Sequence, residues 1–265
     1  MSLGVFAPVT AIQSPVVDLD REATWPQQVL HEITPHICEI IAERTAHNEY
    51  DLSGDRWFKP PPPSSRTDDA FAIINAAMSD QQIRVFHATR LLDKHAVLTE
   101  GLRSLHLINQ IAVVRGELAE RGLYHEVDQL DAAVDEANLA SQFYACREQQ
   151  VWFAPLRRAL SDGGCDIFFE HWGGEAIQRL THSKVQLTNA ICTLGDPAVV
   201  VGNIPAFGAC EFSAARLAPT MLSLMLEREG CEFSVESWDV LLMRDVPPEL
   251  IEAVLPRNDP SLAIT

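Results

Sequence analysis

Residues 84–89 read Arg-Val-Phe-His-Ala-Thr, and this stretch decides the fold that the sequence predicts. Apolar and polar residues alternate along it and β-forming residue types are frequent, so it predicts a strand. The residues that follow, 91–99, have a helical pattern that ends near Gly101. A strand and a helix therefore open a region of mixed secondary structure.

Two longer helical patterns come next and predict an αα-hairpin. In the first, apolar positions between Ile108 and Ala119 recur at helical spacing, and the pattern ends at Gly122. In the second, Val127 and Leu130 share a face with later apolar residues, while the acidic residues lie largely outside it. Such an acidic face is typical of a solvated surface, and no function is assigned to it.

Further short strands follow in the second half of the chain. Apolar runs predict strands at 151–154, 166–169, 198–201 and 238–243. The helices expected around them cover 175–180 and 216–227, with Pro219 near the first turn of the latter, and a one-turn helix at 247–251. Because these strands do not alternate regularly with helices, the pattern favours an α+β fold over a doubly wound parallel sheet.

The first eighty residues form a distinct N-terminal portion in this interpretation, ahead of an α+β domain over residues 81–265. An extended apolar start over 4–17 leads into a helix that Thr34 would cap, with Pro35 in its first turn. The prolines at 60–63 predict a rigid extended arm or linker, with an SH3-type ligand as the alternative.

Composition limits the classes of function. The 265 residues carry 20 Lys and Arg against 37 Asp and Glu, a net charge of −17. This balance argues against nucleic-acid binding, sequence-specific DNA binding included, because phosphate contacts need clustered basic residues. It does not exclude a local anion site. No run approaches the ~20 apolar residues that span a bilayer, and no basic residue precedes Arg21 as in a secretory signal, so we expect no membrane partner and a cytoplasmic protein.

Six cysteines are scattered along the chain without a CxxC pair. Most have apolar neighbours, so the sequence predicts buried, reduced thiols rather than disulfides or a zinc site. The loops typical of nucleotide binding and the short patterns of zinc proteases and serine hydrolases are missing too. Function must therefore be inferred from weaker features.

One such feature is the local charge around the first strand. Residues 84–103 hold four Lys and Arg against two acidic residues, which is what an anionic ligand requires. A half-buried strand histidine at His87, followed by solvated charges, is the alternative.

Two further features lie later in the chain. Gly173 and Gly174 precede Glu175, allow positive φ angles and lead into a helix whose dipole favours an ionised carboxylate. His171, Trp172 and Glu175 would then be displayed at a turn, or Trp172 simply packs there. The aromatic pair Trp152-Phe153 could stack against a flat ring, with core packing as the alternative.

In their order along the chain, these segments resemble the ADP-ribosyltransferase superfamily over roughly residues 84–265. His87 and Thr89 would match the family's histidine segment, Phe153 or Trp152 its stacking aromatic, and Glu175 its catalytic glutamate. The resemblance implies a split, antiparallel-rich sheet with the αα-hairpin as an insertion.

The resemblance also implies NAD as the substrate and cleavage of its nicotinamide–ribose bond. The catalytic residues are then Glu175 and His87, and Arg90 would pair with a pyrophosphate oxygen. The expected NAD-binding residues are Thr89, Arg90, Phe153 and Trp172, and no metal is expected. The acceptor, a protein, a nucleic acid or water, stays open.

Two rival interpretations remain. A non-catalytic acidic interaction protein, an inhibitor or adaptor, would use the acidic surface and the proline arm. A metal or thiol enzyme would use Cys165, His171, His182 and Glu170, but their spacing is irregular and no basic residue adjoins Cys165.

Overall fold

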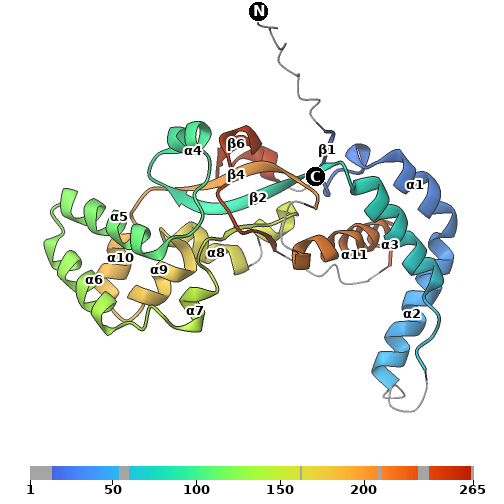
Figure 1. The fold of residues 1–265 in the computed structure, drawn as a ribbon, viewed down its shortest axis with the longest axis horizontal. Coiled ribbons are helices and arrows are strands. Elements are labelled where there is room, and N and C mark those ends of the chain that lie inside the picture. The colour runs from blue at the N-terminus through green and yellow to red at the C-terminus, as the bar shows by residue number, and fades with distance from the viewer. Residues whose placement is uncertain (1–13, 54–59, 162, 208–210, 232–238, 264–265) are drawn as a thin grey trace, which may run out of the picture.

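The computed structural model describes residues 14–53, 60–161, 163–207, 211–231 and 239–263. Helices gather at both ends of the molecule, with the sheets between them (Figure 1). The strands are β1 (Val16–Val17), β2 (Gln82–Leu91), β3 (Val151–Phe153), β4 (Asp196–Pro205), β5 (Val240–Leu242) and β6 (Ile251–Pro256). The helices are α1 (Gln27–Ile33), α2 (Ile37–Ser53), α3 (Ser65–Met78), α4 (Lys94–Glu100), α5 (Leu107–Glu120), α6 (Tyr124–Glu136), α7 (Gln142–Ala145), α8 (Gly163–Glu170), α9 (Gly174–Thr181), α10 (Val185–Ile191) and α11 (Glu211–Arg228). Helices and strands are thus both present, as predicted.

The larger sheet has the order β1-β2-β4-β6. Its centre is the antiparallel pair of β2 and β4, which runs from Gln82 opposite Pro205 to Leu91 opposite Asp196. β4 also pairs antiparallel with β6, whereas β1 runs parallel to β2, so the sheet is mixed. The strands predicted at 84–89 and 198–201 are confirmed.

The second sheet pairs β3 with β5 and is joined to the first by a β-bridge. Phe86 and Ala154 exchange two main-chain hydrogen bonds of 2.8 Å, and this bridge joins β2 to the residue after β3. The bridge brings the end of β3 beside the residues that follow Phe86 on β2. This position matters because His87 comes next.

The helices α5, α6, α7, α9 and α10 build one end of the molecule (Figure 1). Leu118, Leu130 and Ile177 are buried in the core that these helices share. α5 and α6 pack against each other, so the predicted αα-hairpin is present. The predicted apolar face is confirmed in α6, but in α5 the buried residues are Leu107, Ile111, Val114 and Leu118, and Ile108 is 65% exposed, so that face was only partly right.

At the other end, α1, α2 and α11 each pack against α3, beside the larger sheet (Figure 1). Val29, Ile33 and Ile74 share one core with Ile83 of β2 and Leu217 of α11. The N-terminal helices and the later chain therefore bury apolar surface in a common core. This core contains residues from both sides of position 80, where the N-terminal portion was expected to end.

Several local predictions were wrong or incomplete. Thr34 has helical dihedral angles and ends α1, within a 3₁₀ turn (Thr34–His36), so it does not cap a following helix. Pro219 lies inside α11 rather than near its first turn, because the helix begins at Glu211. The strand β6 was not foreseen, although the one-turn helix before it is present (Pro248–Leu250).

The run at 166–169 is helical, not a strand, and belongs to α8. Short apolar runs do not distinguish a buried strand from a buried helix. Here Phe169 packs against β2 and β4 in a small core that includes Phe86 and Val199. Of the other extended stretches, residues 4–13 and Trp238 lie outside the described residues.

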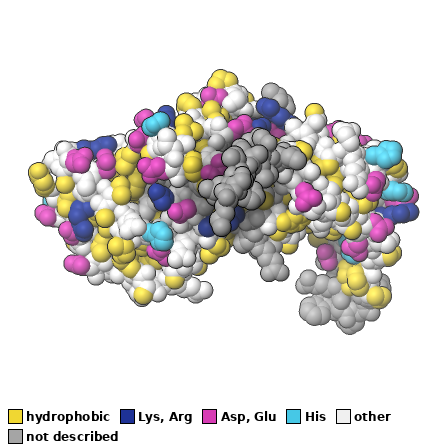
Figure 2. Space-filling view, turned by 45° about the horizontal axis from the view of Figure 1, so that its top comes forward, with side chains coloured by type: hydrophobic (Ala, Val, Ile, Leu, Met, Phe, Trp, Pro, Cys, Tyr) yellow, Lys and Arg dark blue, Asp and Glu magenta, His cyan; other side chains and the backbone are white. Residues whose placement is uncertain are grey.

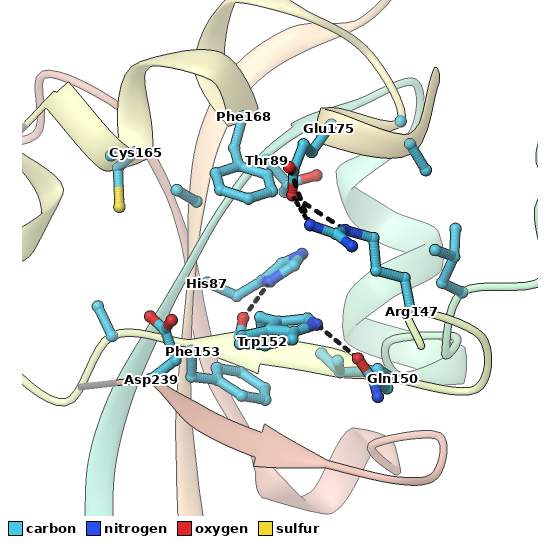
Figure 3. Close-up of a pocket in the computed structure, with 18 of the residues that line it drawn as sticks. His87, Thr89, Arg147, Gln150, Trp152, Phe153, Cys165, Phe168, Glu175 and Asp239 are labelled. Carbon is cyan, nitrogen blue, oxygen red and sulfur yellow. Dashed lines mark hydrogen bonds and ion pairs between the residues drawn. The ribbon is translucent and has the colours of Figure 1, made fainter. Parts of the chain in front are cut away.

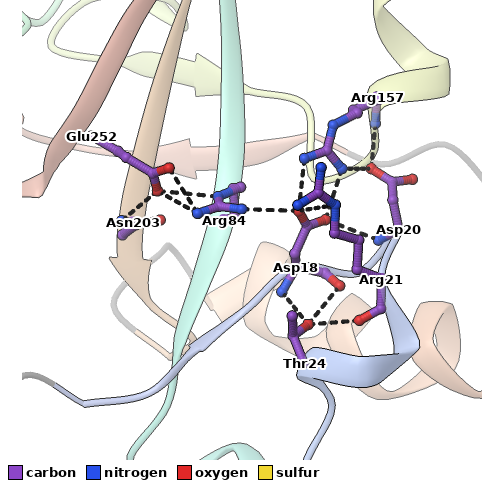
Figure 4. Close-up of polar contacts among 8 residues, drawn as sticks. All are labelled: Asp18, Asp20, Arg21, Thr24, Arg84, Arg157, Asn203 and Glu252. Atoms are coloured by element: carbon purple, nitrogen blue, oxygen red, sulfur yellow. Dashed lines mark hydrogen bonds and ion pairs between the residues drawn. The ribbon is translucent and has the colours of Figure 1, made fainter. Parts of the chain in front are cut away.

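Buried charges fasten the N-terminal segment to the sheet (Figure 4). The Asp18 carboxylate accepts hydrogen bonds of 2.8 and 2.7 Å from Arg157 and one of 3.1 Å from Arg84. Arg157 also binds Asp20, and Arg84 also binds Glu252 of β6. Burial alone raises the pKa of Asp18, but the two guanidinium groups outweigh it and hold that pKa below its ordinary value.

The described cysteines are free thiols, but not all are buried. Cys38 and Cys146 are exposed, and Cys165, Cys192 and Cys231 are half-buried, while Cys210 lies outside the described residues. Cys38 is two positions from the buried Ile40 and so faces away from the core, whatever its neighbours in sequence. The prediction of burial was therefore wrong for Cys38 and Cys146.

Charged side chains are spread over the surface. On the face drawn in Figure 2, Lys and Arg side chains are scattered among Asp and Glu rather than gathered. Within the described residues, every helix is too short or too polar to cross a membrane.

Candidate functional site

A cavity of about 520 Å³ lies where β2, β3, α8 and α9 meet (Figure 3). His87 and Thr89 line it from β2, Trp152 and Phe153 from β3, and Glu175 from α9. Residues as far apart in the chain as Phe86 and Asp239 thus supply its walls. Four of the six residues singled out from the sequence, namely His87, Thr89, Phe153 and Glu175, line this one cavity.

His87 is held in one tautomer. Its Nδ1 atom lies 2.7 Å from the main-chain oxygen of Trp152, which can only accept, so Nδ1 carries the proton. Burial lowers the pKa of His87 more than this hydrogen bond raises it, so the ring is neutral near pH 7. The other ring nitrogen, Nε2, is therefore left as an acceptor, and Figure 3 shows the ring directed into the cavity.

The two aromatic residues of β3 have different roles in the wall. Phe153 is 2% exposed, and its ring centroid lies 5.6 Å from that of His87 at an angle of 60°. Trp152 is 39% exposed, and its indole N–H donates to Gln150 Oε1 at 3.0 Å. Trp152 therefore offers a ring face to a ligand, whereas Phe153 supports the histidine.

Glu175 stands in the first turn of α9, as predicted. Gly173 and Gly174 both have positive φ angles, 77° and 59°. A Cβ atom on Gly173 would lie 2.4 Å from Ile177 Cγ1, and one on Gly174 would lie 2.8 Å from the Phe168 ring. The turn that presents Glu175 therefore requires glycine for both its backbone conformation and its close packing.

The carboxylate of Glu175 is bound by Arg147, a residue that the sequence analysis missed. Arg147 Nε donates to Oε2 at 3.0 Å, and Nη2 donates to Oε1 at 2.9 Å and to Oε2 at 2.8 Å. Arg147 follows α7, where no sequence pattern marks it for a role. It is found only because the fold brings α7 beside α9.

Charged, amide and aromatic side chains all line the cavity. Arg147 and Gln150 lie on one side, where residues 105 and 149–150 are joined by main-chain hydrogen bonds of 3.0 and 2.7 Å. The lining also includes Arg103, Gln110, Ala154, Ala159, Cys165, Phe168 and Asp239. Figure 3 shows Arg147 and Gln150 across the cavity from Cys165 and Asp239. The arrangement suits an elongated ligand with an anionic part and a flat part.

Arg90 and Trp172, also expected to bind the ligand, do not line the cavity. Arg90 donates to the main-chain oxygens of Phe169, Leu194 and Gly195 at 2.8, 2.8 and 2.7 Å. Neighbours on a strand face opposite sides, so Arg90 cannot share the orientation of Thr89. Trp172 is 9% exposed and packs in the core of the helical end.

Acidic side chains neutralise much of the positive charge that residues 84–103 carry. Arg84 pairs with Asp18 and Glu252, whereas Arg103 is 70% exposed and lies 3.4 Å from Glu100 and 3.5 Å from Asp245. Arg103 lines the cavity. This residue is the part of that stretch that a bound anion can reach.

The residues considered for a thiol or metal enzyme do not gather. In the described part of the chain, no group of three or more His, Cys, Asp or Glu could hold a metal ion. His171 Nδ1 lies 3.3 Å from Cys192 Sγ rather than near Cys165. Burial raises the pKa of the Cys192 thiol and lowers that of His171, so both side chains are neutral and the thiol is not activated.

No protein-family model matches the sequence, and no curated protein or solved structure matches the chain.

Proposed function

We propose that the protein cleaves the nicotinamide–ribose bond of NAD, as an NAD glycohydrolase or an ADP-ribosyltransferase. The observation that carries the proposal is that His87, Trp152, Phe153 and Glu175 line one cavity. At about 520 Å³, the cavity falls in the range of roughly 300–1,000 Å³ that is usual for small-molecule sites.

Glu175 is the catalytic residue in this proposal. When the bond between ribose C1′ and the pyridinium nitrogen breaks, its electron pair goes to nicotinamide, which leaves neutral, and C1′ acquires oxocarbenium character. A carboxylate close to this centre stabilises the developing positive charge. The acceptor then bonds to C1′ and loses a proton.

The other wall residues bind and orient the substrate. The free Nε2 atom of His87 accepts a hydrogen bond from a ribose hydroxyl, and Thr89 lies on the same strand face. The exposed ring of Trp152 stacks on the flat nicotinamide, beside Phe168. Asp239, on that side of the cavity, suits the positive charge of the pyridinium ring.

The fold is consistent with the same proposal. Two sheets that diverge from the Phe86–Ala154 bridge, with the α5–α6 hairpin inserted between β2 and β3, resemble the split sheet of the ADP-ribosyltransferase superfamily. A cytoplasmic location and the acceptor, a protein, a nucleic acid or water, stay predictions.

The test is to incubate the protein with NAD and to measure released nicotinamide by chromatography. Glu175→Gln removes the charge that stabilises the transition state, so we expect turnover to fall by about 10²–10³-fold. The NAD dissociation constant, measured by calorimetry, should change far less. Glu136→Gln, on the exposed acid that pairs with Lys184 on the outside of α6, is the matched control.

Two outcomes contradict the proposal. Equal losses of binding and turnover in Glu175→Gln would assign the residue to binding or folding. If NAD is neither bound nor cleaved, the acidic interaction protein becomes the better interpretation.

A further inference from the structure

Four side chains from two segments interlock beside the cavity. Phe143 and Arg147 are four residues apart at α7, and Glu175 and Arg179 are four residues apart on α9. The Phe143 ring lies between two guanidinium groups, 3.9 Å from Arg147 Cζ and 4.2 Å from Arg179 Cζ. We call these four residues the α7–α9 clasp.

The clasp anchors one end of the Arg147 guanidinium away from Glu175. Its Nη1 atom donates to the main-chain oxygen of Phe143 at 2.9 Å, while Nε and Nη2 bind the Glu175 carboxylate. The Phe143 contacts do not depend on Glu175. Arg147 can therefore turn about this anchor when a better partner for Nε and Nη2 arrives.

The pairing found in the free protein opposes the proposed reaction. A guanidinium that neutralises Glu175 reduces the stabilisation that the carboxylate can give to a positive oxocarbenium centre, since like charges repel. Glu175 acts fully only when Arg147 has another anion to bind.

Both members of the pair can be reached by a ligand. The Arg147 side chain is 24% exposed and that of Glu175 41% exposed. Guanidinium binds phosphate with the same two-point geometry as carboxylate. Arg103, which also lines the cavity, supplies a second guanidinium, 3.4 Å from Glu100 and 3.5 Å from Asp245.

We propose that Arg147 is an exchangeable partner, which holds Glu175 in the free protein and moves to the diphosphate of the bound dinucleotide. The inference rests on the proposed function and deepens it. The diphosphate becomes the group that releases the catalytic carboxylate, so substrates without it leave Glu175 paired. The site is thereby selective for diphosphate nucleotides in turnover and not only in binding.

The experiment supplies two parts of the substrate as separate compounds, the nicotinamide riboside and the pyrophosphate. Nicotinamide release from nicotinamide riboside, which has no phosphate, is measured with and without inorganic pyrophosphate. In the wild type we expect pyrophosphate to raise kcat for the riboside by about tenfold or more, as for a group that acts on the transition state. Arg147→Met should cleave the riboside faster than the wild type without pyrophosphate and should not respond to it, while its KM for NAD rises.

Arg115→Met is the matched control. Arg115 forms an ion pair with Asp131 on the outside of the αα-hairpin and does not line the cavity. This variant should respond to pyrophosphate as the wild type does, and calorimetry should find pyrophosphate binding weakened in Arg147→Met only.

The outcomes separate the two proposals. If NAD is cleaved but pyrophosphate has no effect on the riboside, or if Arg147→Met loses kcat on both substrates alike, Arg147 stays on Glu175 as a fixed positioning residue and this inference fails alone. If no nicotinamide is released from NAD, both proposals fail.

Discussion

The Asp18 carboxylate and the Arg157 guanidinium meet at 2.8 and 2.7 Å, although 139 residues separate them. Their side chains are 1% and 6% exposed. Each charge is therefore shielded from water and depends on the other. This contact fastens the segment after β1 to the loop after β3, next to the strand that carries His87.

Asp18 is the acid that Arg157 and Arg84 share, so its removal leaves Arg157 with Asp20 alone and Arg84 with Glu252 alone. We expect Asp18→Asn to lower the free energy of unfolding by about 3 kcal/mol, the lower end of the range for broken buried ion pairs. Urea denaturation measures the loss. Glu227→Gln, which breaks the half-exposed pair with Arg158, should cost less than about 1 kcal/mol. Similar small losses in both variants would contradict this account of Asp18.

The turn before Glu175 makes a prediction about glycine. Gly173→Ala introduces a Cβ atom at a positive φ angle and 2.4 Å from Ile177 Cγ1, so we expect about 1–3 kcal/mol of destabilisation. Gly116→Ala, inside α5 with no atom within 4 Å of the added Cβ, should instead stabilise the protein by about 0.5–1 kcal/mol. Thermal unfolding of both variants distinguishes the two effects, and stabilisation by Gly173→Ala would refute the turn geometry.

Two histidines make stability depend on pH. Burial lowers the pKa of His87 and of His171 below the ordinary value of 6.5. At acidic pH the unfolded chain therefore binds more protons than the folded chain does. Stability is therefore complete above about pH 6.5 and falls as the pH decreases below it, by at most about 1.4 kcal/mol per pH unit for each histidine. The fall ends below the folded-state pKa values.

Urea denaturation between about pH 7.5 and 5.5, one unit either side of the ordinary value, tests this slope. His87→Gln should give a shallower slope than the wild type, and the residual slope should decrease again in the double variant with His171→Gln. The Asp18 carboxyl does not interfere, because its pKa lies below 3.8 and its contribution is lost only at more acidic pH. Equal slopes in the wild type and His87→Gln would show that the imidazole is not desolvated.

The exposed ring of Trp152 makes a prediction about binding. If it stacks on nicotinamide, Trp152→Ala should weaken NAD binding by about 2- to 10-fold, the equivalent of roughly 0.5–1.5 kcal/mol, and Trp152→Phe should weaken it less. Calorimetry provides the dissociation constants. Tyr124→Ala, on a 68% exposed aromatic residue of α6 away from the cavity, should leave them unchanged. Unchanged NAD binding in Trp152→Ala would show that the nicotinamide ring does not stack on Trp152.

Local structure was predictable where periodicity was strong. The pattern over 84–89 lies inside β2, and the helical spacings of 108–119 and 127–137 correspond to α5 and α6. Prediction failed at 166–169, because a run of four consecutive apolar or acidic residues is too short to repeat either period and so does not distinguish a helix from a strand. Residue type also suggested His87 and Glu175, since a strand histidine and a glutamate after two glycines stand out in an otherwise ordinary sequence.

The sequence by itself determined the strongly periodic elements, the glycine turn that presents Glu175, and the strand that carries His87, because each depends on residues close together in the chain. Only the tertiary structure decided that these residues line one cavity, that Arg90 faces away from it, and that Arg147 binds Glu175. The physical reason is that contacts between side chains far apart in the sequence depend on how the hydrophobic cores pack. The Phe86–Ala154 bridge and the contact of α7 with α9 leave no periodic trace in the residues that form them.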